Sequence, residues 1–203
     1  MNTKKMFCFM GLLVCVLFLF SSCNKPVKQA ERADFPKELK PVDYLPLNVG
    51  NSWTYEVRQF FIDGKAPKES SLLTKVIDNK NGEASVLSGD QIIKYKIKDS
   101  GIFKLSSKTL LIPQPINKDA EWDINIAGIH GKGKILSTSE KVITPTGLFE
   151  NCLLIEERYS EDDLIIHYAY APKVGLVRIE EYVIMDKKEF LHLQASLRIY
   201  TVQ

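Results

Sequence analysis

Apolar and polar residues alternate along most of the chain beyond residue 44. The alternation is clearest in four stretches, at 53–58, 93–98, 121–126 and 191–199. Successive side chains of a β-strand point to opposite faces, so each stretch predicts a strand with one apolar and one polar face. In the last stretch, the residues expected to share the apolar face are Leu191, Leu193, Ala195, Leu197 and Ile199. No segment of this part shows a comparable helical period, and the pattern therefore predicts an all-β domain.

Short segments rich in Gly, Asp, Asn, Ser and Pro separate the alternating stretches. They lie at 62–67, 78–83, 88–90, 98–101, 160–163 and 185–188. A parallel crossover needs a dozen or more residues, so connections this short favour hairpins in a meander. We expect an antiparallel, strongly curved sheet of roughly ten strands, because a single sheet of this size curls or splits. The fold class expected is a partly open barrel or half-barrel, with a folded sandwich as the other way to cover the apolar face.

The first 22 residues have the layout of a secretory signal. Lys4 and Lys5 precede an apolar run from Met6 to Phe20 that contains no acidic residue. At about 15 residues, this run is shorter than the roughly 20 that a membrane-spanning helix needs. The following sequence, Phe20-Ser21-Ser22-Cys23, resembles the lipobox of bacterial lipoproteins, in which the cysteine is acylated and becomes the new N-terminus.

This resemblance implies a lipid attached to Cys23 and removal of residues 1–22. Residues 23–43 are polar and rich in proline, and they are expected to form a flexible tether to a single domain at 44–203. Each buried methylene of an acyl chain contributes about 0.8 kcal/mol, so two or three chains would hold the protein firmly on its membrane. The alternatives are an ordinary signal peptide cut near Ser22 and an uncleaved anchor, and both still place the domain outside the cytoplasm. In a host with two membranes, Asn24 in place of Asp favours the periplasmic face of the outer membrane.

Charge and cysteine content narrow the possible partners. Removing residues 1–22 takes away two of the 27 basic residues and none of the 25 acidic ones, which leaves a net charge of zero. The chain has no basic tail and no aromatic platform with arginines, so no nucleic-acid partner is expected. Cys8 and Cys15 leave with the leader and Cys23 carries lipid, so Cys152 has no partner for an intramolecular disulfide.

Three blocks resemble an uncharacterised family of bacterial lipoproteins. They are YLPLNVGNSWTYEV at 44–57, TPTGLFENCLLIEE at 144–157 and YAPKVGLVRIEE at 170–181, which carry the patterns GNxWxY, TPxGxFxxC and YAPxVGLV. The resemblance implies an all-β envelope domain and brings no catalytic residue with it. Some similar folds, the half-barrels of lipoprotein carriers, hold lipid in a concave apolar face, which is an analogy of fold alone.

Candidate sites for metals, phosphate or catalysis are weak. The three histidines, His130, His167 and His192, do not stand at ligand spacing, and no metal or other cofactor is expected. The glycines of GIHGKGK at 128–134 precede a strand instead of a helix, so they are expected to bend the sheet and not to bind phosphate. The acidic segment 160–163 is expected to be a solvated hairpin tip.

Catalysis is not expected either. Cys152 flanks the apolar run CLLI, and a buried thiol is usually inert, so the protein is not predicted to be an enzyme. The lysines at 94, 96 and 98 could meet anionic headgroups, but protection of an edge strand is the commoner role of such a stripe.

Two hypotheses of function remain. In the first, the concave face binds an apolar ligand such as a lipid, and the residues expected to contact it are Trp53, Tyr55 and Trp122, with Phe60, Tyr168 and Tyr170 as further lining. In the second, the core is filled by the protein's own side chains and the outer surface contacts an envelope partner. The segments 45–53 and 112–122 both lead from an apolar-proline start to a tryptophan that opens a strand, which indicates either two related half-units or a coincidence.

Overall fold

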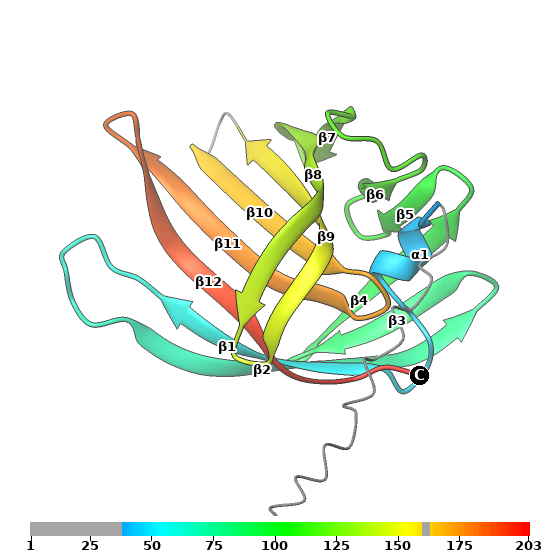
Figure 1. The fold of residues 1–203 in the computed structure, drawn as a ribbon. Coiled ribbons are helices and arrows are strands. Elements are labelled where there is room, and N and C mark those ends of the chain that lie inside the picture. Colours follow the sequence, from blue (N-terminus) through cyan, green and yellow to red (C-terminus); the bar gives the residue numbers. More distant parts are fainter. Residues whose placement is uncertain (1–37, 160–162) are drawn as a thin grey trace, which may run out of the picture. The chain divides into compact units, whose positions relative to one another are not determined.

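The computed structural model describes residues 38–159 and 163–203, which form an antiparallel β-sheet and one short helix (Figure 1). The elements are α1 (Pro41–Tyr44), β1 (Ser52–Gln59), β2 (Lys68–Lys80), β3 (Glu83–Ser88), β4 (Gln91–Lys98), β5 (Gly101–Lys104), β6 (Thr109–Pro113), β7 (Glu121–Ile126), β8 (Ile129–Thr144), β9 (Gly147–Tyr159), β10 (Leu164–Ala171), β11 (Gly175–Met185) and β12 (Lys188–Thr201). The expected all-β, antiparallel and partly open barrel is confirmed. The sheet has twelve strands in place of roughly ten, because β5 and β6 have only four and five residues and show too few alternations to be recognised.

The sheet is a meander that closes at one place and stays open at another. Each strand pairs with the next from β1 to β6 and from β7 to β12, and β1 also pairs with β12. That β1–β12 ladder, from Ser52 opposite Thr201 to Gln59 opposite Leu193, is called the closed junction below. The edge strands β6 and β7 do not pair with each other, and their meeting place is called the open junction. The result is a barrel that is nearly complete, with one seam in the middle of the chain.

Both described ends of the chain lie at one end of this barrel, the capped end. Leu45 and Leu47 follow α1 and are buried, with 9% and 4% of their surface exposed. Asn51 is fully buried, donates from Nδ2 to Pro46 O at 2.8 Å and accepts from Gln203 N at 3.0 Å. Since the strands alternate in direction, the turns β1–β2, β3–β4, β5–β6, β7–β8, β9–β10 and β11–β12 lie at the opposite end.

The folded part begins before the expected boundary at residue 44. Pro41 and Tyr44 of α1 are buried, Asp43 accepts the backbone N–H of Lys40 at 2.8 Å, and the carbonyl of Asp43 accepts the N–H of Lys173. The short helix is therefore a part of the domain instead of the tether. Residues 23–37 of the expected tether, which include Cys23, lie outside the described residues, as does the leader.

A bulge in β12 changes the expected apolar face of the last strand. Tyr55 pairs with Leu197, but the preceding Thr54 pairs with Ile199, so Arg198 is the extra residue of the bulge. The extra residue reverses the alternation, and Ile199 faces outward with 61% of its surface exposed while Leu197 is fully buried. A second bulge lies at His192, because Glu181 pairs with Leu193 and the next residue, Tyr182, pairs with Leu191, so Leu191 and Leu193 lie on opposite faces. The expectation that Leu191 to Ile199 keep one face was therefore wrong at both Leu191 and Ile199.

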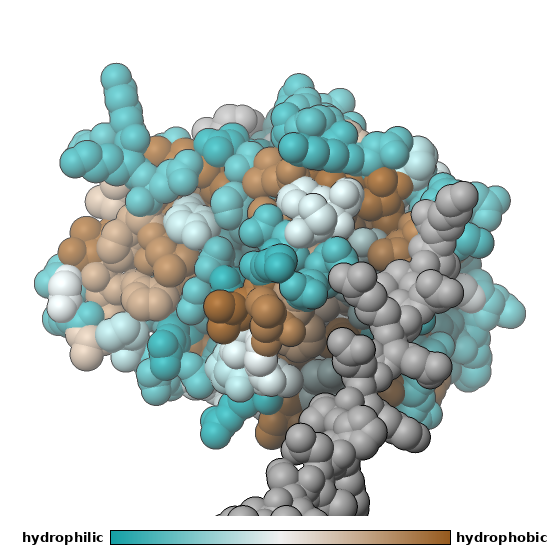
Figure 2. Space-filling view, in the orientation of Figure 1, coloured by the Kyte–Doolittle hydropathy of each residue, from teal (hydrophilic) through white to brown (hydrophobic). Residues whose placement is uncertain are grey.

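The hairpin of β8 and β9 is the longest of the sheet, and its end folds over the outer side of β12. Thr146 donates its hydroxyl to Leu197 O at 2.9 Å, and the rings of Phe149 and Tyr200 lie 6.2 Å apart. Apolar side chains reach the surface in patches between hydrophilic ones (Figure 2), and Ile143 and Leu148 of this hairpin are 70% and 57% exposed.

The lysine stripe at 94–98 does not protect an edge, because β4 pairs on both sides, with β3 and with β5. Lys96 forms an ion pair with Glu83 at 3.0 Å, and Lys98 lies over the ring of Phe103. The expected role in blocking edge pairing was therefore wrong.

Candidate functional site

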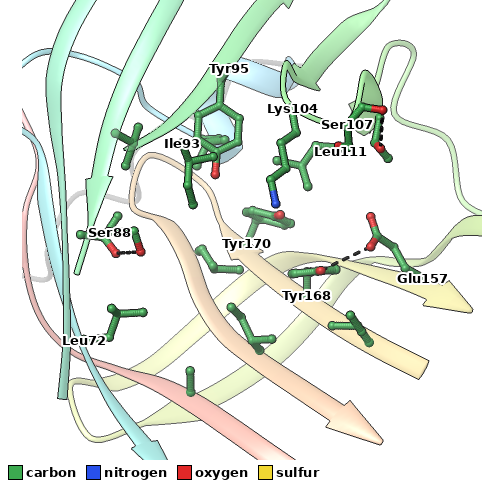
Figure 3. A pocket seen from close by; sticks show the side chains of 18 of the residues that line it. Leu72, Ser88, Ile93, Tyr95, Lys104, Ser107, Leu111, Glu157, Tyr168 and Tyr170 are labelled. Atoms are coloured by element: carbon green, nitrogen blue, oxygen red, sulfur yellow. Dashed lines mark hydrogen bonds between the residues drawn. The ribbon is translucent and has the colours of Figure 1, made fainter. Parts of the chain in front are cut away.

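The inner face of the sheet encloses a cavity of about 490 Å³ (Figure 3). Small-molecule sites range from roughly 300 to 1,000 Å³, so the cavity is large enough for a ligand. Strand alternation supplies its walls: in β10, for example, the lining residues are Leu164, Ile166, Tyr168 and Tyr170. The cavity extends from Leu45 and Leu47 at the capped end to Ile126 and Ile129, which flank the β7–β8 turn at the opposite end.

The wall next to the closed junction carries no charged side chain and is mainly apolar, and its two aliphatic hydroxyl groups, on Thr74 and Ser88, lie 3.3 Å apart and bond each other. It includes Trp53 and Tyr55 of β1, Leu176 of β11 and Ala195 of β12. The polar atoms of the two aromatic residues are bound to the backbone: Trp53 Nε1 donates to Val174 O at 2.6 Å, and the Tyr55 hydroxyl donates to Leu176 O at 3.0 Å. Burial strongly raises the pKa of Tyr55, so its hydroxyl stays protonated and can donate. This wall therefore offers rings and aliphatic groups to the cavity, with no free donor on Trp53 or Tyr55.

Six lining residues with polar side chains gather nearer the open junction, and we call them the polar cluster. They are Lys104, Ser107, Thr109, Glu157, Tyr159 and Tyr168. Lys104 pairs with Thr109 of the edge strand β6, and Glu157 pairs with Gly133 of β8, whose other neighbour is the edge strand β7. The cluster thus comes from both sides of the open junction.

Glu157 is the buried acid of the polar cluster, with only 4% of its surface exposed. Its Oε2 accepts the hydroxyls of Tyr159 at 2.8 Å and Tyr168 at 3.3 Å. Within residues 38–159 and 163–203, its Oε1 accepts no hydrogen bond. Burial raises the pKa of Glu157, and the two tyrosine hydrogen bonds and the charge of Lys104 oppose this rise.

Lys104 and Ser107 also have unused polar atoms at the cavity. The ammonium of Lys104 forms no ion pair with any described residue. Ser107 Oγ is buried and has no hydrogen-bond partner among the described residues. In Figure 3, Lys104 reaches from its strand toward Tyr170, while Glu157 extends from the other wall. Ser107 Oγ, Glu157 Oε1 and the ammonium of Lys104 therefore form no hydrogen bond or ion pair with another described residue, although the charge of Lys104 is close enough to act on Glu157.

The three residues expected to contact a ligand are not all at the cavity. Trp53 and Tyr55 line it, as do Tyr168 and Tyr170. Trp122 instead lies half-buried at the open junction, where its Nε1 donates to Leu110 O of β6 at 2.9 Å. Neither Trp122 nor Phe60 is among the lining residues.

Sequence reasoning missed the charged pair Lys104 and Glu157. A signal for Glu157 exists, because it continues the inward phase of Leu153 and Ile155 in β9, and an acid in an apolar phase is unusual. No such signal exists for Lys104, since β5 is too short to show a period.

In segment 128–134, Gly131 and Gly133 leave room for aromatic rings of neighbouring strands. Gly128 occupies the β7–β8 turn with φ +94°, but a Cβ on Gly133 would lie 2.2 Å from the Trp122 ring, and one on Gly131 would lie 2.8 Å from the Tyr159 ring. The bulges between β8 and β9 come later, after Ile135. The expected bulge is therefore absent at Gly131 and Gly133, where both ladders of β8 keep a regular register.

The other candidate groups are scattered. Across the described ranges, no three His, Cys, Asp or Glu residues come close enough to hold a metal ion. His167 Nε2 lies 3.2 Å from Glu156 Oε2 on the outer face. Burial raises the pKa of Cys152 to about 12, so its thiol stays protonated at neutral pH. Residues 160–162 of the acidic segment lie outside the described part.

Comparisons with known proteins do not add a relationship: no family model, no curated protein and no solved structure matches the chain. Among residues 38–159 and 163–203, no helix has the length and apolar character needed to span a membrane. The fold and the cavity define a class by themselves, a nearly closed antiparallel β-barrel with an interior of ligand size.

Proposed function

We propose that this protein is a bacterial envelope lipoprotein whose β-domain binds an apolar ligand, such as a lipid, inside the barrel. The observation that supports this is the cavity of about 490 Å³, which the protein's own side chains leave unfilled. A core filled by its own side chains, as the alternative requires, would have no such space, since protein interiors are normally close-packed. The function proposed is binding without catalysis, with Trp53 and Tyr55 in the ligand-contacting wall.

The anchor in this proposal is a lipid on Cys23, the product of the lipobox at 20–23. The domain would then be held at the cell envelope, on the periplasmic face of the outer membrane if the host has one. Labelled palmitate tests the anchor: Cys23→Ser should abolish labelling, and unchanged labelling would contradict it.

A cavity-filling variant tests ligand binding. Ala195 lines the cavity, so Ala195→Phe should reduce the lipid that co-purifies with the full chain from its own compartment, as measured by native mass spectrometry. Thr54→Phe is the matched control, because Thr54 faces outward beside Leu73 and Ile199, which are both exposed. Equal lipid in both variants, or no bound apolar molecule in the wild type, would contradict the proposal.

A second candidate function is contact with an envelope partner. It is favoured by the exposed apolar side chains Ile143 and Leu148 at the end of the β8–β9 hairpin. Ile143→Asp should weaken such a contact without changing the cavity, and crosslinking in intact cells would measure the loss.

A further inference from the structure

The polar cluster constrains which apolar molecule the cavity can accept, and this inference rests on the proposed function. A pure hydrocarbon would fill the space but offer nothing to Lys104, to Ser107 Oγ or to Glu157 Oε1. A hydrocarbon that fills the cavity would separate these atoms from solvent, and a buried polar group left without a partner costs about 1 to 3 kcal/mol, with a higher cost for a charged group. The ligand must therefore carry polar atoms at the end that meets the polar cluster.

The unused atoms define the chemistry of that end. The ammonium of Lys104 is a donor and needs an acceptor, while Glu157 Oε1 is an acceptor and needs a donor. Ser107 Oγ can serve as either. A hydroxyl group or an amide both donates and accepts, so one uncharged head group offers an acceptor to Lys104 and a donor to Glu157.

The balance of charge excludes a charged head group. Lys104 and Glu157 are the only charged residues among the described lining of the cavity, so the lining has a net charge of zero. A carboxylate head would pair with Lys104 but stand beside Glu157, and a long-chain amine would pair with Glu157 but stand beside Lys104. Either would leave one uncompensated charge in a mostly apolar interior, which is expensive.

We propose that the cavity binds a single-chain amphiphile with an uncharged hydroxyl or amide head, the head lying between Lys104 and Glu157. The chain lies along the apolar wall of Trp53, Tyr55 and Leu176. The polar cluster orients the molecule, because the opposite orientation would leave both charges against hydrocarbon. Monoacylglycerols are the simplest members of this ligand class.

Four probes with matched chains test the inference at neutral pH: monopalmitoylglycerol, palmitate, hexadecylamine and hexadecane. Binding to the delipidated full chain is measured by isothermal titration calorimetry. Monopalmitoylglycerol should bind at least about 10-fold more tightly than each of the others, which corresponds to about 1.4 kcal/mol.

Two variants should change the preference in opposite directions. Lys104→Met leaves the negative charge alone, so monopalmitoylglycerol should lose about 10-fold in affinity and hexadecylamine should gain. Glu157→Gln leaves the positive charge alone, so palmitate should become the preferred probe. Lys94→Met is the control, because Lys94 is an exposed lysine on β4, and its affinities should equal those of the wild type.

The possible results distinguish failure of the uncharged head group from failure of the proposed ligand binding. If palmitate binds the wild type as tightly as monopalmitoylglycerol, the uncharged head is wrong although an apolar ligand is still bound. If none of the four probes binds, the proposed function fails with it. Loss of equal size for every probe in Lys104→Met would show a structural role of that lysine and overturn the inference. Denaturant unfolding of each variant identifies failure to fold, and Lys104→Met keeps the test valid if Glu157→Gln does not fold.

Discussion

The closed and open junctions are two places where the first six strands meet the last six, and they are built differently. At the closed junction, β1 and β12 form a backbone ladder along the whole length of β1. At the open junction, β6 and β7 share no ladder, and the Trp122 indole donates across the gap to Leu110 O. One junction is thus held by the backbone, and the other is bridged by a side chain.

A tryptophan over a glycine occurs at both junctions. The Trp53 ring lies over Gly175, where an added Cβ would stand 3.1 Å from the indole nitrogen. The Trp122 ring lies over Gly133, where an added Cβ would stand 2.2 Å from the nearest ring atom. Each indole also donates to a backbone carbonyl. Trp53, however, is only 3% exposed, whereas Trp122 is half-buried. The same arrangement therefore belongs to the core at one junction and to a partly solvated bridge at the other.

The cavity follows this difference. Uncharged side chains, mostly apolar and aromatic, line the side of the closed junction, and both charged lining residues lie toward the open one. Charged groups cost less where water can approach, so an incomplete ladder is a place where Lys104 and Glu157 can reach the interior.

Replacing each tryptophan by alanine should give the largest difference in stability between the two junctions. Trp53→Ala deletes a fully packed ring and should lower the free energy of unfolding by about 3 to 5 kcal/mol. Trp122→Ala deletes a half-buried ring and should cost about 1 to 2 kcal/mol. Urea unfolding measures both, and equal losses would contradict the distinction between the junctions.

Substitution of the two glycines by alanine should have the second-largest effect, and the two substitutions should act differently. Gly175→Ala meets a backbone with φ +110° and the closely packed Trp53 ring, so it should cost about 1 to 3 kcal/mol. Gly133→Ala should instead push the Trp122 ring outward. Fluorescence in a Trp53→Phe background should then shift to longer wavelength for Gly133→Ala, and an unchanged spectrum would show that the ring keeps its place.

Glu157 should make stability depend on pH. Its pKa is raised in the folded protein by burial, so the folded state binds more protons than the unfolded state in the range above the ordinary glutamate value. The free energy of unfolding contributed by Glu157 therefore falls as pH rises through this range, by at most about 1.4 kcal/mol per pH unit. The difference between wild type and Glu157→Gln isolates this effect, and a difference that is constant with pH would contradict it.

Removing only the hydrogen bond from the Trp122 indole to Leu110 O should have the smallest effect on stability. Trp122→Phe keeps most of the ring and removes the hydrogen bond to Leu110 O, at a cost of about 0.5 to 1.5 kcal/mol. Amide hydrogen exchange should become faster in β6 and β7 and stay unchanged in β1 and β12. Faster exchange throughout the sheet would mean that the bridge supports the whole barrel.

Much of this architecture could be predicted from local pattern. Alternation identified the strands that contain Trp53 and Tyr55 and placed both side chains on the inner face, where they line the cavity. The same signal was available for Glu157, which keeps the inward phase of Leu153 and Ile155. It was insufficient for Lys104 in a strand of four residues and for Ile199 beyond a bulge, because one extra residue reverses the phase.

The sequence by itself determined that this domain is an antiparallel sheet with one apolar face, because the two-residue period of a strand is a local property of the chain. Only the tertiary structure decided that β1 pairs with β12, that β6 and β7 stay apart, and that Lys104 and Glu157 share one cavity. Those contacts join residues far apart in the sequence, and they depend on how the curved sheet closes and packs, which no local period records.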